Sequence, residues 1–327
     1  MDWKSYYRDE LARPESLSAI EGFFSRAEDD PQIDEAIARR EVLSFPHTAL
    51  SYAGPLQARV IAGLYRARVS NVIALGVLHT SIIPPPYAEA LDRLRDSSID
   101  PDVRKAGLAQ LSGAFFPSGE KISTPFGDLP LASIGPHRLI RADAGILKNE
   151  FSLDTFLSLM AFYANQRGID PLPVVPLYIG ITYDPVEGSF AIAAEFARTL
   201  RRLIGPETAV VTTGDLVHYG MAYGDEARIP RMPKGKRALE IYFLRETEDV
   251  LALALSRRNL KEAFTKSFEV LKSDQRYILP IIAELLGPEA DYEILYFELS
   301  DYAGILTVEP PCYVASSLIT YRAVPLR

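Results

Sequence analysis

Three of the four histidines in this chain follow short apolar runs that are typical of buried strands. His47 comes just after Val42–Phe45, His79 follows Val72–Leu78, and His218 lies shortly beyond a third run. Open α/β sheets hold their ligand sites at the carboxyl ends of their parallel strands. We therefore expect the three imidazoles to gather at one edge of a sheet. The simpler reading, in which each ring satisfies a buried carbonyl, does not account for this repeated placement.

Histidines in this arrangement predict a metal site. Neutral imidazoles suit Zn, Fe, Cu or Ni, and two histidines plus one carboxylate on one face form the ligand set of non-haem iron oxygenases. Asp274 and Ser273 stand where a helix is predicted to begin, so either can also serve as its N-cap. A third histidine outside the metal shell has the pKa range that a general acid or base requires. The candidates for the carboxylate ligand are Asp274, Asp215, Glu150 and Asp143.

The elements that must position these side chains follow an alternating pattern. A helix with one apolar face is predicted over Pro55–Arg66, so the strands on either side of it should lie parallel and adjacent. Further strands are predicted over 172–179, 209–213, 294–298 and 313–321, a hairpin over 116–131, and helices over 87–110 with a break at Asp100-Pro101, 143–164, 188–204, 236–255, 260–270 and 273–286.

This order predicts an α/β fold in which helices cover both faces of one largely parallel or mixed sheet. We divide the chain into an N-terminal helical extension, residues 1–38, that packs on the core, and a metal-binding α/β domain, residues 39–327. The length of 327 residues is enough for a large core.

Composition excludes several classes of function. The net charge of −8 argues against nucleic-acid binding, which needs a basic face. The basic cluster Arg228–Arg237 is read as a solvated loop and helix start, or else as a clamp for an anion. Cys312 is the single cysteine, which excludes an intrachain disulfide and a cysteine-based zinc site. No apolar run reaches the roughly 18 residues of a membrane span, and the polar N-terminus shows no signal core, so we expect a cytoplasmic protein.

Six motifs in order resemble the Memo-like proteins, which are related to the class III extradiol ring-cleaving dioxygenases of the LigB-type superfamily. The resemblance covers about residues 40–325 and implies a single α/β domain with a metal site at one end of its sheet. The matching segments read FPHTALSYAG, VIALGVLHTS, STPFGDLPL, NEFSLD, VPLYIG and VTTGDLVHYG.

Carried over position by position, the resemblance makes His47 and His79 metal ligands and His218 an acid/base beside the metal. This sequence departs from the family pattern at three places: Thr80 and Phe151 each replace a histidine, and Ser273 stands where Memo-like proteins have a ligating cysteine. The ring-cleaving relatives have a carboxylate at the analogous place. Asp274, one residue further on, restores that carboxylate, so we favour a two-histidine, one-carboxylate iron site.

The function expected from this reading is an Fe(II)-dependent oxygenase or dioxygenase acting with O2 on a small catechol-, aminophenol- or related phenol-type substrate. His218 would move the substrate proton, Asp215 would orient His218 or cap the local turn, and Tyr52 would hydrogen-bond substrate or oxygen. Copper and zinc stay open as alternative metals. The alternative function is a non-catalytic or redox-active copper protein that binds a phosphorylated peptide or another anion in the same cleft. The resemblance also makes a homo-oligomer an expectation.

Overall fold

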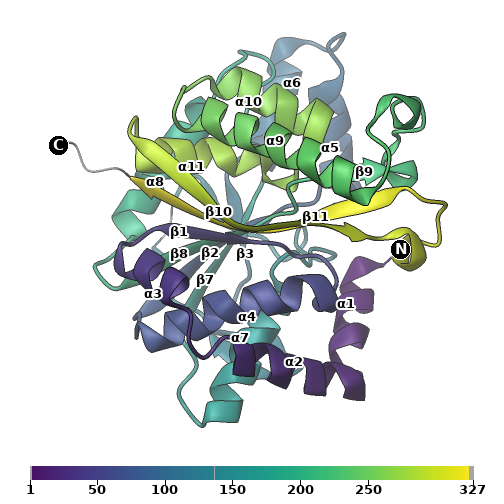
Figure 1. Ribbon diagram of the computed structural model, residues 1–327. Coiled ribbons are helices and arrows are strands. Elements are labelled where there is room, and N and C mark those ends of the chain that lie inside the picture. The colour runs from purple at the N-terminus through teal and green to yellow at the C-terminus, as the bar shows by residue number, and fades with distance from the viewer. Residues whose placement is uncertain (1, 136, 324–327) are drawn as a thin grey trace.

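The computed structural model describes residues 2–135 and 137–323 of the chain. In this part of the chain a mixed sheet lies between two layers of helices (Figure 1). Its strands follow the order β10-β11-β1-β8-β2-β7-β3-β6, and β9 pairs with β11. The strands are β1 (Val42–Phe45), β2 (Asn71–Val77), β3 (Ala114–Phe116), β6 (Ile140–Ala142), β7 (Val174–Ile179), β8 (Thr208–Thr213), β9 (His218–Gly220), β10 (Ala290–Asp301) and β11 (Cys312–Ala323).

The centre of the sheet is parallel and antiparallel pairs flank it. β1, β8, β2 and β7 run parallel to one another. On one side β11 runs antiparallel to β1 and to β10, and on the other β3 runs antiparallel to β7 and parallel to β6. The central strands are buried on both faces, which fits their Val- and Ile-rich sequences. The predicted α/β fold with a mixed sheet and flanking helices is thereby confirmed.

The predicted adjacency of β1 and β2 is wrong. The two strands are parallel, but β8 lies between them and pairs with both, with Leu43 opposite Val211 and Ala74 also opposite Val211. A crossover helix only requires its strands to be parallel, and the β-branched, buried β8 is suited to the centre of the sheet. As a consequence, the loop after β8 reaches the same edge of the sheet between the two histidine-bearing loops.

Helices cover both faces of the sheet and divide the core into two parts (Figure 1). On one side, α2 and α3 pack on α4, and α4 packs on α7; α8, α9 and α11 cover the other side. The helices are α1 (Trp3–Leu11), α2 (Pro14–Arg26), α3 (Pro31–Ala38), α4 (Leu50–Arg66), α5 (Pro85–Arg95), α6 (Pro101–Leu111), α7 (Asp154–Arg167), α8 (Ala191–Leu203), α9 (Lys236–Ala254), α10 (Leu260–Lys266), α11 (Leu279–Leu286) and α12 (Ala303–Leu306). Short helical turns follow at Met221–Tyr223, Ile229–Arg231, Ser267–Leu271 and, as η4, Asp274–Tyr277.

One predicted helix begins later than its sequence suggested. Helical structure was expected from residue 143, but α7 starts at Asp154. The Asp143 carboxylate accepts hydrogen bonds from the backbone of Gly145 and Ile146, and the Glu150 carboxylate accepts them from Phe151 and the residue after it. Such side-chain bonds offer the backbone an alternative to the helix. They leave residues 143–153 as turns and direct Glu150 toward the sheet.

Other local predictions agree with the structure. The segment over 116–131 contains the hairpin of β4 (Lys121–Thr124) and β5 (Gly127–Pro130). The helix predicted over 273–286 begins as α11 at Leu279, with Pro280 in its first turn. Proline is tolerated in the first turn of a helix but not in its interior. Among the described residues, no helix is both long enough and apolar enough to cross a membrane.

Candidate metal centre

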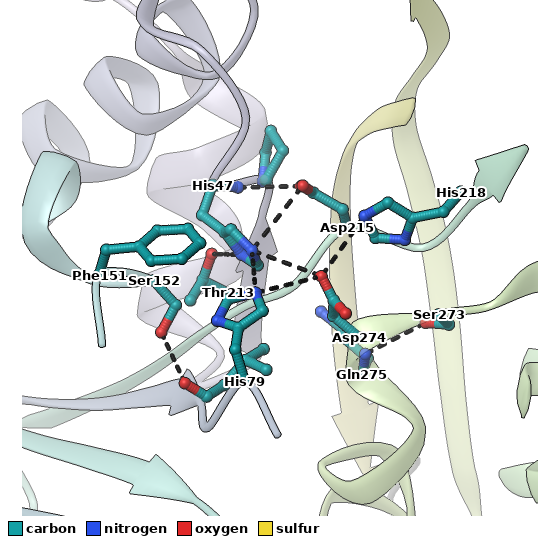
Figure 2. Close-up of polar contacts among 12 residues, drawn as sticks. His47, His79, Phe151, Ser152, Thr213, Asp215, His218, Ser273, Asp274 and Gln275 are labelled. Atoms are coloured by element: carbon teal, nitrogen blue, oxygen red, sulfur yellow. Dashed lines mark hydrogen bonds and ion pairs between the residues drawn. The ribbon is translucent and has the colours of Figure 1, made fainter. Parts of the chain in front are cut away.

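His47, His79 and Asp274 meet at the carboxyl edge of the parallel strands, although they come from three distant parts of the chain (Figure 2). The Nε2 atoms of His47 and His79 lie 3.2 Å apart. The Asp274 Oδ2 atom lies 3.5 Å from the first and 3.6 Å from the second. The three candidate ligand atoms therefore form a nearly equilateral triangle.

The size of this triangle fits a bound transition metal. Metal–nitrogen and metal–oxygen distances are about 2.1 Å, so two ligands of one ion lie about 3.0 Å apart at a right angle and about 3.4 Å apart at a tetrahedral angle. The nitrogen–nitrogen separation of 3.2 Å lies within this range, and the two nitrogen–oxygen separations of 3.5 and 3.6 Å are slightly longer than the tetrahedral value. Two imidazole nitrogens and one carboxylate oxygen are also a chemically suitable donor set for iron or zinc.

Glu150 fixes the orientation of His79. One carboxylate oxygen accepts a hydrogen bond from the His79 backbone N–H at 2.7 Å, and the other accepts one from Nδ1 at 3.1 Å. Because a carboxylate only accepts, Nδ1 carries a proton and donates it to Glu150, and Nε2 is the ring nitrogen that faces the cluster. Carboxylate–histidine pairs of this kind are typical of metal sites. Phe151 supports the same ring by stacking on it, with centroids 4.5 Å apart.

Asp215 positions His47 and makes no hydrogen bond to His218. Its Oδ1 atom accepts a hydrogen bond from the His47 backbone N–H at 3.0 Å. The His47 ring is oriented further by a contact of 3.3 Å between Nδ1 and the Thr213 hydroxyl. Both partners come from β8 and the loop after it, which the strand order places beside β1.

Asp274 is free to face the cluster because Ser273 caps the helical turn. The Ser273 hydroxyl accepts a hydrogen bond from the Gln275 backbone N–H at 3.1 Å. The Gln275 side chain in turn bonds Ser44 and Tyr321, which holds η4 against the sheet. A Cβ on Gly214 would lie 2.4 Å from Gln275 Cγ, so only glycine allows the β8 loop to approach this closely.

His218 lies on the far side of Asp274, with its Nε2 atom 3.6 Å from Oδ2 (Figure 2). Its Nδ1 atom donates to the Lys272 carbonyl at 2.9 Å, so its Nε2 atom is the one directed at the cluster. Lys272 adopts a left-handed backbone conformation with φ of 53°. His218, Asp274 and Asp215 form a second group of candidate ligand atoms within 4.8 Å of one another, and this group shares Asp274 with the first.

The charges in the centre reinforce one another. Burial alone would raise the pKa of Asp274, but the neighbouring charge of His218 and the contacts with His47 and His79 hold it well below its ordinary value. Burial likewise would raise the pKa of Glu150, yet His79 and the backbone hydrogen bonds lower it to about 2. Burial would lower the pKa of His79, but the charges of Glu150 and Asp274 raise it. Asp274 and Glu150 therefore stay ionised at neutral pH and create a field that attracts cations.

Two residues that shape the centre have no clear signal in the sequence. The Lys272 carbonyl accepts the hydrogen bond from His218 Nδ1. Its position depends on a left-handed backbone conformation that a lysine in the sequence does not predict. Tyr223 contacts the His218 ring edge-on, with centroids 4.9 Å apart. Together with Phe151 it gives the cluster aromatic walls. The side chains of His79 and His218 are each 15% exposed, so part of each ring reaches solvent.

Several other residues lie outside this cluster. The Tyr52 hydroxyl donates to the Asp301 carbonyl at 3.2 Å, so the structure does not bring it to the histidines. His137 makes local contacts with Leu139 and Thr199. Cys312 is fully buried in β11 and belongs to neither group of candidate ligands in the described residues.

Comparison with known proteins gives one relevant similarity. Over 117 residues the chain is 29% identical to the MEMO1 family protein PH1626 of Pyrococcus horikoshii, a match that covers 34% of this chain and 38% of that protein. No protein-family model matches the chain. The similarity supports a Memo-like relationship.

Proposed function

We propose that this protein is a non-haem Fe(II)-dependent oxygenase acting on a small substrate with two adjacent donor atoms, such as a catechol or an aminophenol. One observation carries the proposal: two imidazole Nε2 atoms and one carboxylate oxygen converge at metal-ligand spacing, with a third imidazole directed at the same carboxylate. Two histidines and one carboxylate are the ligand set of the non-haem iron oxygenases.

The roles of the residues follow from their contacts. His47, His79 and Asp274 would hold the metal, and bound Fe(II) would supply Lewis acidity and the redox chemistry that O2 requires. His218 would take the substrate hydroxyl proton at Nε2, because its Nδ1 proton is committed to the Lys272 carbonyl. Glu150 and Asp215 would keep the two ligand rings in place.

The walls of the centre favour an aromatic substrate. Phe151 lies against His79 on one side and Tyr223 against His218 on the other. Phe151 is only 6% exposed and would serve as a wall behind His79, so Tyr223 would contact the substrate ring. The metal and His218 would bind the polar edge of the substrate. This division of an apolar wall and a few polar groups is what small-molecule sites commonly show.

The structure offers less support for an anion-binding adaptor. Two members of the basic cluster already have partners in the protein: Lys236 pairs with Glu298 at 2.8 Å, and Arg228 donates to the Val270 carbonyl at 2.7 Å. Its other members, Arg231, Lys234 and Arg237, are exposed. A copper-based redox role would be favoured by a soft thiolate ligand, and the described candidate ligands are histidines and carboxylates only. Zinc fits the same triangle of donors. Because Zn²⁺ has no redox activity, oxygen uptake would distinguish an iron centre from a zinc centre.

The test is oxygen consumption by protein loaded with Fe(II) under anaerobic conditions and then mixed with aerated catechols, aminophenols and amino-acid-derived phenols. We expect uptake with at least one substrate in the parent and none in the His47→Ala variant. His218→Gln should bind iron like the parent and lose at least a hundredfold in turnover, since general acid–base catalysis commonly contributes about 10²–10⁴-fold.

Two results would contradict the proposal. Absence of oxygen uptake across the panel, with iron bound at one equivalent, would show that the centre is not an oxygenase. Equal iron binding by the parent and the His47→Ala variant would show that the ligands are elsewhere.

A further inference from the structure

A cavity away from the candidate metal ligands has Glu150 in its lining. It has a volume of about 650 Å³ and is bounded by α1, the β4–β5 hairpin and the first turn of α7. Its apolar lining includes Leu11, Leu147 and Leu157. None of the three candidate metal ligands lines it, so it is a separate space with its own chemistry.

Asp154 supplies the cavity with an unpaired carboxylate. Among the described residues, no hydrogen bond or ion pair reaches its side-chain oxygens. Lys4 also lines the cavity, but its ammonium donates to the Lys148 carbonyl at 3.3 Å. Burial raises the pKa of Asp154 to about 7. The charge of Lys4 opposes this shift, and the charge of Glu150 adds to it. A carboxylate held in this way is stabilised most by a cation that enters the cavity.

Tyr178 supplies the cavity with a second free polar group. The residue is only 6% exposed and lines the same cavity, and its hydroxyl makes no hydrogen bond to any described residue. The hydroxyl oxygen is not one of the fully enclosed unpaired atoms of the described residues, so it is open to a ligand or a water. Burial and the negative charges of Asp154 and Glu150 raise the pKa of Tyr178, so the phenol stays protonated and can both donate and accept.

The cavity is lined by side chains of both charges. Asp154 and the ionised Glu150 are acidic, and Lys4 and Arg8 of α1 are basic. Glu150 already accepts hydrogen bonds from His79, Phe151 and Ser152, so it contributes charge and leaves Asp154 as the free acceptor. A ligand that carries both an ammonium and a carboxylate matches this mixed lining, whereas the second ammonium of a diamine would be repelled by Lys4 and Arg8.

We propose that this cavity binds a small amino acid, with its ammonium group on Asp154 and Tyr178, its carboxylate toward Lys4 and Arg8, and its body against the leucines. The inference is independent of the metal chemistry proposed above. An ammonium group has three donors, which matches the free oxygens of Asp154 and the Tyr178 hydroxyl.

Binding of a panel of α-amino acids and 4-aminobutanoate to the full chain at about pH 8, measured by calorimetry and ligand-detected NMR, tests the proposal. We expect at least one member to bind, and its N-acetyl derivative to bind at least tenfold more weakly. Asp154→Asn should also weaken binding at least tenfold. Tyr178→Phe and Lys4→Ala should each weaken it severalfold. Asp170→Asn, which removes an exposed carboxylate beyond α7, is the matched control and should bind like the parent.

The outcomes are separable from those of the metal site. If no amino acid binds to the parent, or if the Asp154→Asn and Lys4→Ala variants both bind as the parent does, the proposal is overturned. Circular dichroism identifies a variant that fails to fold, and N-acetylation tests the ammonium contact without any mutation. Preferred binding of 1,4-diaminobutane would overturn the assignment of the carboxylate end.

Discussion

Replacing Glu150 by glutamine tests whether the orientation of His79 governs metal binding. Glu150 accepts from both the backbone N–H and the Nδ1 atom of His79, at 2.7 and 3.1 Å, and is almost fully buried. Glutamine has nearly the same shape, but it presents one NH2 group to these donors and carries no charge. The variant therefore loses at least one hydrogen bond and the field that makes His79 a better ligand.

Loss of such a supporting carboxylate typically costs about 10–100-fold in metal affinity, which corresponds to about 1.4–2.7 kcal/mol. We expect the Glu150→Gln variant to bind Fe(II) or Zn²⁺ more weakly by this factor in competition with a chromogenic chelator. Asp143→Asn is the control, because Asp143 orders the same loop through Gly145 and Ile146 without touching His79.

The control should bind metal within about twofold of the parent. If Glu150→Gln binds metal as tightly as the parent while remaining folded, Glu150 does not act on the metal through His79. If Asp143→Asn weakens binding as much, the effect comes from the order of the loop and not from the carboxylate–histidine pair. A chelator series that covers at least three decades of affinity separates these results.

Three further predictions concern stability and packing. Phe151→Ala removes the ring stacked on His79 and should lower the free energy of unfolding by about 3 kcal/mol, measured by urea denaturation; an effect below 1 kcal/mol would contradict the observed packing. Gly214→Ala places a Cβ against Gln275 and should cost about 1–3 kcal/mol together with weaker metal retention, and unchanged retention would show that η4 adapts. Burial raises the pKa of Asp154 to about 7. Above about pH 4 the unfolded state loses this proton while the native state keeps it. The free energy of unfolding therefore falls as the pH rises from about 4 to about 7. Asp154→Asn should therefore gain roughly 2 kcal/mol relative to the parent between about pH 5 and about pH 8, whereas a constant difference would refute the raised pKa.

Local sequence predicted most of the elements but not their lateral order. The apolar runs before His47 and His79 identify β1 and β2 because burial on both faces leaves a plain signature. The apolar runs of β1 and β2 do not indicate that β8 lies between these two strands, because the order of parallel strands depends on long-range pairing. The insertion matters, because it brings Asp215 and Thr213 to His47.

The site shows the same division between local and long-range information. Histidines at strand ends are visible in the sequence, and their convergence follows from parallel strands meeting at one edge. Whether Asp274 or Ser273 caps η4 is a matter of side-chain geometry, and the structure gives the cap to Ser273. From the sequence, Glu150 is only one more candidate ligand. Its contact with His79 depends on residues 143–153 forming turns in place of the predicted helix, and these turns direct its carboxylate at His79.

Anomalous X-ray diffraction from a crystal of the Fe(II)-loaded protein, collected on both sides of the iron edge, tests the central claim most directly. The account predicts one strong peak about 2.1 Å from His47 Nε2, His79 Nε2 and an Asp274 carboxylate oxygen, with His218 Nε2 outside bonding distance. A peak bonded to other residues, or no peak in crystals whose iron content is one equivalent, would contradict it.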